Sequence, residues 1–298
     1  MDVLLPDITN PQGYFFWLIV VSILLVVLER IWPWRKDQRL ARPQIWQDLF
    51  WLIFNGHYAG VLLALGVSRV LAWANPTYEQ IEAVKLIASQ PLWAQFLGFF
   101  VLKDLLEWGV HNLLHRVPWL WEFHKLHHSI ERLDWIGNFR FHWMEILVYR
   151  GLTYVPLALL GADALVLLPI AVVSTLIGHF NHSNLRISWG PMRYVFNSPR
   201  MHVWHHDRDW PPEHPRGVNF GICLSLWDWV FRTAWWPSER ECPGQQPERL
   251  GFRGMDEYPS ALRDRLVYPV SRIWTRRALG SGAKHVGEVP IAGRKPGA

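Results

Sequence analysis

The stretch LWAQFLGFFVLKDLLEWGVHNLLH, residues 92 to 115, decides the fold because it joins an apolar segment to a pair of histidines. The segment is close to the roughly 20 residues that a helix needs to cross a bilayer. His111 and His115 stand four positions apart near its end, so a helix places both imidazoles on one face. The stretch therefore predicts a membrane helix that ends in potential metal ligands.

Three further stretches have a similar apolar character, in a chain of 298 residues of which 50% are hydrophobic. Residues 14 to 32 and 49 to 67 each match one membrane span. Residues 146 to 180 are too long for one span and contain a Gly-Ala-Asp break at 161 to 163, which indicates a helical hairpin. We therefore expect an all-α, polytopic membrane bundle of about four to five spans or half-spans.

The rest of the chain indicates one domain. We expect residues 1–278 to form a single membrane-embedded domain whose motif core covers about 104–236. Residues 279–298 are rich in glycine, proline and lysine and lack an apolar period, so we expect a disordered tail.

Basic residues give the expected orientation. Five of them lie at the end of the first apolar stretch or just after it, which places this connection in the cytoplasm and the N-terminus outside: Arg30, Arg35, Lys36, Arg39 and Arg42. Counting the crossings then puts the histidine-bearing segments in a helical cap at the cytoplasmic face. The net charge of +5 is spread along the chain, which favours a lipid bilayer as partner and indicates no nucleic acid.

Histidines are concentrated in the middle of the chain. Eleven of the 14 lie between His111 and His206, in the groups HNLLH, HKLHH, FHWME, HFNH and HVWHH. With only two cysteines, a metal site must rely on imidazoles. Each HxxHH triplet can present three imidazoles from one side of a helical turn. Their number exceeds one tetrahedral zinc site, so two metal ions are the natural interpretation, while imidazole alone does not choose between iron, zinc, copper and nickel.

Simpler interpretations remain for some of these residues. HNLLH alone arises by chance as readily as by function, and His57 within an apolar stretch is more often a packed residue than a ligand. Arg150 either extends to the membrane surface or binds a substrate headgroup. Carboxylates near the histidine groups are candidates to orient imidazoles by accepting their second N–H. These are Asp104, Glu107, Glu122, Glu145, Asp207 and Asp228.

The ordered motifs resemble those of the fatty acid hydroxylase and sterol desaturase superfamily of membrane di-iron oxygenases. The resemblance covers Asp104 to Trp236 and includes DLLEWGVHNLLH, HKLHHS, RFHWME, HSNLRISWGPMRYVFNSPRMHVWHH and NFGICLSLWDWVFRT. It implies metal ligation by His111, His115, His124, His127, His128, His182, His202, His205 and His206, with His142 and His179 as further candidates. Trp143, Asn112 and Arg232 depart from the usual pattern, and Trp143 replaces the proline that often follows the histidine at position 142.

The resemblance also implies a reaction. It implies an oxidoreductase that uses two Fe ions and O2 to hydroxylate or desaturate an unactivated C–H position of a lipid, such as a sterol or fatty acyl chain. The chain contains neither a G-x-G-x-x-G nor a C-x-x-C-H motif, so we expect no haem or nucleotide in this chain. Electrons would come from an external ferredoxin, cytochrome or flavoprotein reductase. A metal-ion handling membrane protein and a catalytically inactive lipid-binding homologue remain alternatives.

Overall fold

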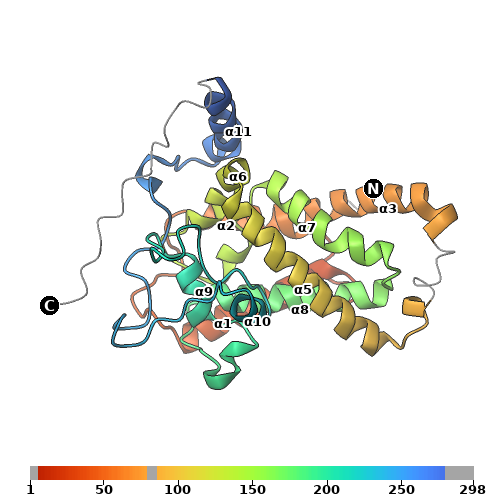
Figure 1. Ribbon diagram of the computed structural model, residues 1–298, viewed down its shortest axis with the longest axis horizontal. Helices are drawn as coiled ribbons and strands as arrows, with labels where there is room; N and C mark the ends of the chain where they lie inside the picture. Colours follow the sequence, from red (N-terminus) through yellow and green to blue (C-terminus); the bar gives the residue numbers. More distant parts are fainter. Residues whose placement is uncertain (1–5, 79–85, 279–298) are drawn as a thin grey trace.

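Five long helices form the body of the molecule. The computed structural model describes residues 6–78 and 86–278. In these ranges the chain is helical, and only isolated β-bridges accompany the helices. The long helices run roughly lengthwise in Figure 1 and are α1 (Tyr14–Ile31), α3 (Ala59–Tyr78), α5 (Leu92–Arg116), α7 (Trp143–Leu159) and α8 (Ala164–His182). Helix α8 packs against α1 and α5, and α7 packs against α3 and α5. The predicted all-α bundle is confirmed.

The turn between α7 and α8 lies at the Gly-Ala-Asp break. Gly161 adopts a φ of 81°, in the region that favours glycine. The Asp163 side chain accepts a hydrogen bond from the backbone N–H of Leu165 (2.7 Å) and so caps the start of α8. Residues 146 to 180 therefore form the helical hairpin that the sequence predicted.

Helix α3 continues a helix that begins earlier than expected. It follows α2 (Ile45–Ile53) and the π-helical turn η2 (Phe54–Tyr58) without a break. The fully buried Asn55 lies in this turn and donates to the backbone carbonyls of Phe139 (2.9 Å) and Phe141 (2.8 Å). The wider turn thus fixes α3 to the segment that precedes α7.

The length and surface of the helices identify a membrane protein. Three helical stretches are long and apolar enough to cross a membrane: Tyr14–Ile31, Ile45–Val70 and Leu165–His182. Large apolar side chains remain exposed on the bundle, including Ile23 (60%) and Leu97 (54%), as expected where lipid replaces water. Helix α7 has only 17 residues and α5 contains charged residues, so these two predicted spans are less apolar, although both belong to the bundle.

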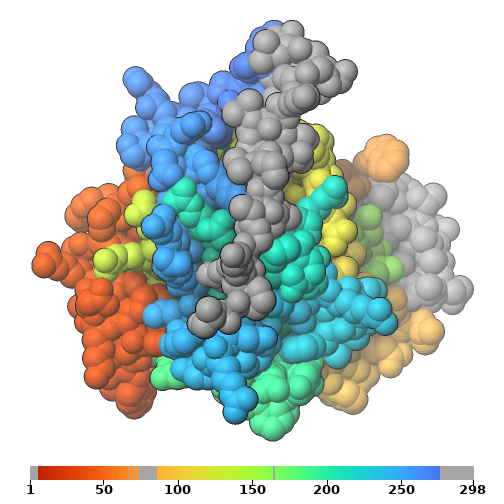
Figure 2. Space-filling model, turned by 60° about the vertical axis from the view of Figure 1, so that its left-hand side comes forward, coloured from red at the N-terminus to blue at the C-terminus, as the bar shows by residue number. Residues whose placement is uncertain are grey.

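Shorter elements gather at one end of the bundle, on the left of Figure 1. They are α6 (Pro118–His128), η3 (Trp135–Phe139), η4 (Gly190–Tyr194), α9 (Pro199–His205), α10 (Leu226–Val230), η5 (Met255–Glu257) and α11 (Leu262–Ala278). We call this end the cap. The chain that follows α8 forms much of the cap face shown in Figure 2. The N–H of Trp34 donates to the carbonyl of Asn184 (2.7 Å), so the chain just after α1 joins the chain just after α8 at the cap.

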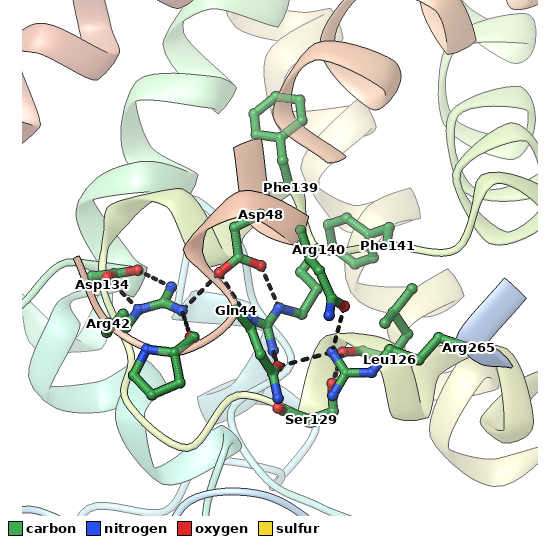
Figure 3. A network of polar contacts seen from close by, with 12 residues as sticks. Arg42, Gln44, Asp48, Leu126, Ser129, Asp134, Phe139, Arg140, Phe141 and Arg265 are labelled. Carbon is green, nitrogen blue, oxygen red and sulfur yellow. Dashed lines mark hydrogen bonds and ion pairs between the residues drawn. The ribbon is translucent and has the colours of Figure 1, made fainter. Parts of the chain in front are cut away.

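A buried ion-pair network joins α2 to the cap (Figure 3). Arg140 donates to both carboxylate oxygens of Asp48 (2.5 and 2.6 Å), and Arg42 bridges Asp48 (2.7 Å) and Asp134 (2.5 and 2.6 Å). Arg140 also donates to the carbonyl of Ser129 (2.9 Å), the residue that follows His128. Because buried charges are stable only with partners, this network fixes the chain between α6 and α7.

Candidate metal centre

Nine buried histidines lie in two adjacent clusters in and beside the cap. In each cluster the candidate ligand atoms all lie within 4.8 Å of one another. The first cluster consists of His111, His115, His124, His128 and His205, and the second of His127, His182, His202 and His206. The rings of His128 and His206, one from each cluster, have centroids 4.8 Å apart. Helices α5, α6, α8 and α9 thus contribute to one continuous region of imidazoles.

Each HxxHH triplet divides between the two clusters, which corrects the expectation that its three imidazoles face one site. His124 and His128 belong to the first cluster, while His127 belongs to the second. In the other triplet His205 belongs to the first cluster, while His202 and His206 belong to the second. Residues three and four positions after a given residue share its face of the helix but lie on either side of it, so the histidines of one triplet can point into two neighbouring sites.

Backbone carbonyls orient three imidazoles of the first cluster. Nδ1 of His111 donates to the carbonyl of Phe220 (2.8 Å), and Nδ1 of His205 donates to that of Val218 (2.8 Å). Nδ1 of His115 makes the same contact with the carbonyl of Arg216 (3.1 Å). A carbonyl only accepts, so each Nδ1 carries the hydrogen and each Nε2 keeps its lone pair for the cluster.

Gly217 allows this loop to approach the cluster. Its φ of +110° lies in the region that favours glycine, and a Cβ there would lie 2.9 Å from Nδ1 of His115. The family motif that begins at Asn219 includes part of this loop, but sequence reasoning did not predict that the loop carbonyls bind imidazoles, because any residue provides a carbonyl.

Two other imidazoles are fixed in the same way. Nδ1 of His124 is hydrogen bonded to Oε1 of Glu145 (2.6 Å), and both side chains are fully buried. Nδ1 of His182 donates to the carbonyl of Gly178 in the preceding turn (2.8 Å). These contacts also direct Nε2 toward the other histidines.

The distances between Nε2 atoms fit a shared metal ion. Nε2 of His182 lies 3.3 Å from that of His127, 3.1 Å from that of His202 and 3.3 Å from that of His206. One lone pair cannot accept three hydrogen bonds at once. Imidazoles bound at roughly 2.0–2.1 Å to one ion have their nitrogens about 3.0–3.4 Å apart. In the first cluster, Nε2 of His115 and His128 are also 3.1 Å apart, while Nε2 of His111, His124 and His205 have no partner.

Burial keeps the imidazoles of the cap neutral. It lowers the pKa of six histidines well below the ordinary value, and repulsion from neighbouring imidazoles acts in the same direction for all six. They are His124, His127, His128, His202, His205 and His206. A neutral imidazole is the form that binds a metal. The donor set therefore fits metal ions held by nitrogen ligands.

The carboxylates expected to orient imidazoles act in different ways. Glu145 contacts an imidazole directly, whereas Asp104 accepts from the N–H groups of Cys223 (2.8 Å) and Leu224 (3.0 Å). Asp228 accepts from the N–H of Phe220 (2.8 Å), whose carbonyl in turn binds His111. Both aspartates thus position loops instead of contacting an imidazole through these bonds.

The other candidates make local contacts. Glu107 binds Nζ of Lys103 (2.6 Å), and Glu122 binds Nζ of Lys125 (2.8 Å). Asp207 accepts from the N–H of Asp209 (3.0 Å) at the exit of α9.

His142 and His179 lie outside both clusters. Nδ1 of His142 accepts from the N–H of Met144 (3.2 Å), which caps α7, and its Nε2 donates to the carbonyl of Leu266 (3.0 Å). His179 contacts Asn138 through Nδ1 (3.0 Å) and Ser22 through Nε2 (3.4 Å). The structure therefore gives these two histidines other partners.

An apolar cavity adjoins the second cluster. It has a volume of about 660 Å³ and is lined by residues of α1, η2, α3, α5, α7 and α8. Phe141 lines it and stacks on the ring of His127, with centroids 4.4 Å apart and an interplanar angle of 5°. A hydrocarbon chain in the cavity would therefore be separated from His127 by a single aromatic ring.

The fold and the two clusters define a helical membrane protein with paired sites that could hold metal ions through histidine. Residues 96–233 match the family model described as fatty acid hydroxylase. Together with the relatives below, this match shows that the chain is similar to the fatty acid hydroxylase and sterol desaturase superfamily. No solved structure matches the chain.

Curated relatives are similar over different shares of their length. The ornithine lipid hydroxylase OlsE of Rhizobium tropici is 26% identical over 92% of this chain and 81% of its own length. Alkylglycerol monooxygenase of Xenopus tropicalis is 24% identical over 76% of this chain and 48% of its own length. Methylsterol monooxygenase 1 of Rattus norvegicus is 25% identical over 67% of this chain and 65% of its own length.

Proposed function

We propose that this chain is a membrane lipid oxygenase that hydroxylates an unactivated C–H position, with two iron ions in the two histidine clusters. The observation that carries the proposal is the division of nine buried histidines into adjacent groups of five and four. The relatives named above are a lipid hydroxylase and two monooxygenases, which favours hydroxylation over desaturation.

The nine clustered histidines would hold the metals. Two bound iron ions would supply the redox chemistry that activates O2. The part of the protein is to fix the imidazoles: the carbonyls of Arg216, Val218 and Phe220 and the carboxylate of Glu145 keep Nδ1 protonated and Nε2 available. Burial of the clusters excludes bulk water, which protects a reactive centre from side reactions.

The balanced reaction requires an external partner. One oxygen atom of O2 enters the C–H bond and the other leaves as water, which consumes two electrons and two protons. We propose that a ferredoxin, cytochrome or flavoprotein reductase supplies the electrons at the cap.

We further propose that the cap lies in the cytoplasm and the N-terminus outside. The basic residues after α1 support this orientation by the positive-inside tendency. The elements of the cap gather at one end of the bundle (Figure 1), so one accessibility measurement tests them together. A cysteine introduced in place of exposed Arg186 should react with a membrane-impermeant thiol reagent only after the membrane is opened. Labelling of this cysteine in intact cells would indicate the opposite orientation.

We also propose that residues 1–278 form one domain. Residues of α1 and α2 share a hydrophobic core with η3, which lies within the segment matched by the family model. The predicted disordered tail, 279–298, lies outside the described residues.

The test is oxygen incorporation. The purified chain, loaded with ferrous iron and supplied with a surrogate ferredoxin and its reductase, should transfer label from ¹⁸O2 into a lipid extract. His202→Ala and His205→Ala, one in each cluster, should abolish the transfer. His179→Gln is a matched control, because His179 is equally buried but lies outside both clusters. Loss of label in the control alone, or unchanged transfer in both cluster variants, would contradict the proposal.

A further inference from the structure

The apolar cavity beside the second cluster is lined by a cation that has no ion-pair partner. Four charged side chains line it: Asp7, Lys103, Glu107 and Arg150. Nζ of Lys103 pairs with Oε1 of Glu107 (2.6 Å), and exposed Asp7 accepts two hydrogen bonds from Thr9 (2.8 and 2.7 Å). Among the described residues, Arg150 makes no ion pair and no side-chain hydrogen bond. The four charges of the lining sum to zero, but Arg150 is the one of its two cations that has no carboxylate partner among the described residues.

The side chain of Arg150 points inward instead of extending to the membrane surface. Its guanidinium lies over the ring of Phe139, 5.9 Å from the centroid. On α3, a Cβ at Gly60 would lie 3.7 Å from Nη1 of Arg150, so the guanidinium sits against the backbone of that helix. An unpaired arginine within a membrane helix is costly unless a ligand or water compensates its charge. This geometry favours the interpretation that Arg150 binds a substrate headgroup over the interpretation that it extends to the membrane surface.

Further polar atoms in the cavity lack a hydrogen bond. Among them are Nε2 of His57, on η2, and Oε2 of Glu107, whose other oxygen binds Lys103. The guanidinium and this imidazole can both donate to an anionic oxygen group, whereas the rest of the lining is mainly apolar.

The position of Arg150 suits an amphiphile. Arg150 lies seven residues after the start of α7, or about 10 Å along the helix axis from the cap. An anionic group at this depth stays close to the membrane surface, while its hydrocarbon chain occupies the apolar part of the cavity beside Phe141.

We propose that this cavity binds a lipid that carries a carboxylate or phosphate group, and that Arg150 receives this group. The inference rests on the proposed function for the identity of the reaction but not for the binding itself. Substrates would then be anionic or zwitterionic lipids, and neutral sterols or alcohols with the same chain would bind less tightly. Arg150 is a specificity-determining residue in this scheme, not a metal ligand.

Binding to purified full-length protein in neutral detergent tests the proposal. The probes are oleate, 1-oleoyl lysophosphatidic acid and oleyl alcohol, which share one chain, and the readout is intrinsic tryptophan fluorescence under anaerobic conditions without an electron donor. We expect oleate or the lysophosphatidic acid to bind roughly ten- to a hundredfold more tightly than the alcohol, since a charge-assisted hydrogen bond is lost with the alcohol.

Substitutions assign the preference to Arg150. Arg150→Gln should remove most of the preference for the anionic probes over oleyl alcohol. Binding of oleyl alcohol should stay unchanged, which also shows that the cavity remains folded. Arg150→Lys should keep most of the preference. Exposed Arg186→Gln is the matched control and should behave as the original chain.

Several outcomes would overturn the proposal. Equal affinity of the original chain for the three probes overturns it, and so does a preference that persists in Arg150→Gln. If sodium acetate displaces oleate as effectively as free oleate does, the site binds small anions and the lipid assignment is wrong. Oxygen incorporation without an anion preference would overturn this inference alone, whereas an anion preference without oxygen incorporation would overturn the proposed function alone.

Discussion

The hydrogen bond between Glu145 and His124 gives a quantitative prediction about the first cluster. Glu145→Gln keeps the size of the side chain and an acceptor oxygen but removes the negative charge that a bound cation would favour at this fully buried contact of 2.6 Å. A hydrogen bond to a charged partner contributes about 1.5–3 kcal/mol, and one between neutral groups about 0.5–1.5 kcal/mol. The substitution should therefore cost about 1–1.5 kcal/mol of orientation energy. This corresponds to a roughly tenfold loss of metal affinity, within the range known for such outer partners.

The assay is an anaerobic titration of metal-free protein with ferrous ion against a chelator of known affinity. We expect two binding phases in the original chain and a weakening of only one of them in Glu145→Gln. Glu131→Gln is the control, because it makes the same substitution at an exposed position just after α6. If both phases of Glu145→Gln match those of the control while the variant melts normally, this carboxylate does not orient a metal ligand.

Three further predictions concern stability, the loop beside His115 and pH. Arg140→Gln removes one of the two cations that bind Asp48 and leaves Arg42, so the free energy of unfolding should fall by about 1.5–3 kcal/mol, and an unchanged thermal midpoint in detergent would contradict the role of the network. Gly217→Ala should lower the metal content because the new Cβ meets the imidazole of His115; Gly190→Ala, also at positive φ but in open space, should leave the metal content unchanged. The metal-free protein should lose stability as the pH falls below about 6.5, because the unfolded chain then binds more protons than the folded chain, whose cap imidazoles have lowered pKa values. Each imidazole contributes up to about 1.4 kcal/mol per pH unit, and a thermal midpoint that is constant from about pH 7.5 to 5.5 would rule this out.

Histidine spacing predicted much of the site but not how it divides. The nine histidines that the family motifs indicated are the nine that cluster, because positions three and four apart on short helices must share a face. Their division into five and four depends on how α6 and α9 pack against α5 and α8, which is tertiary information. His142 has a histidine's usual ligand chemistry, yet it caps α7 because the chain places it at the first turn of that helix.

The same limit applies to the acidic residues and the cavity. Sequence proximity to histidines could not distinguish Glu145, which binds an imidazole, from Asp104, which holds the backbone of residues 223 and 224. Hydropathy predicted the long helices, since exposed apolar side chains in lipid leave a composition signal. It left the direction of the Arg150 side chain open, because that direction depends on the space beside Gly60 in another helix.

Metal content of the intact purified protein tests the central claim most directly. We predict about two iron ions per chain after loading, about one in His205→Ala and in His202→Ala, and about two in His179→Gln. Loss of both metals in the double variant His202→Ala/His205→Ala would complete the pattern. Metal content that is near zero in the original chain, or that is unchanged in both single cluster variants, would contradict the assignment of two metal sites to these nine histidines.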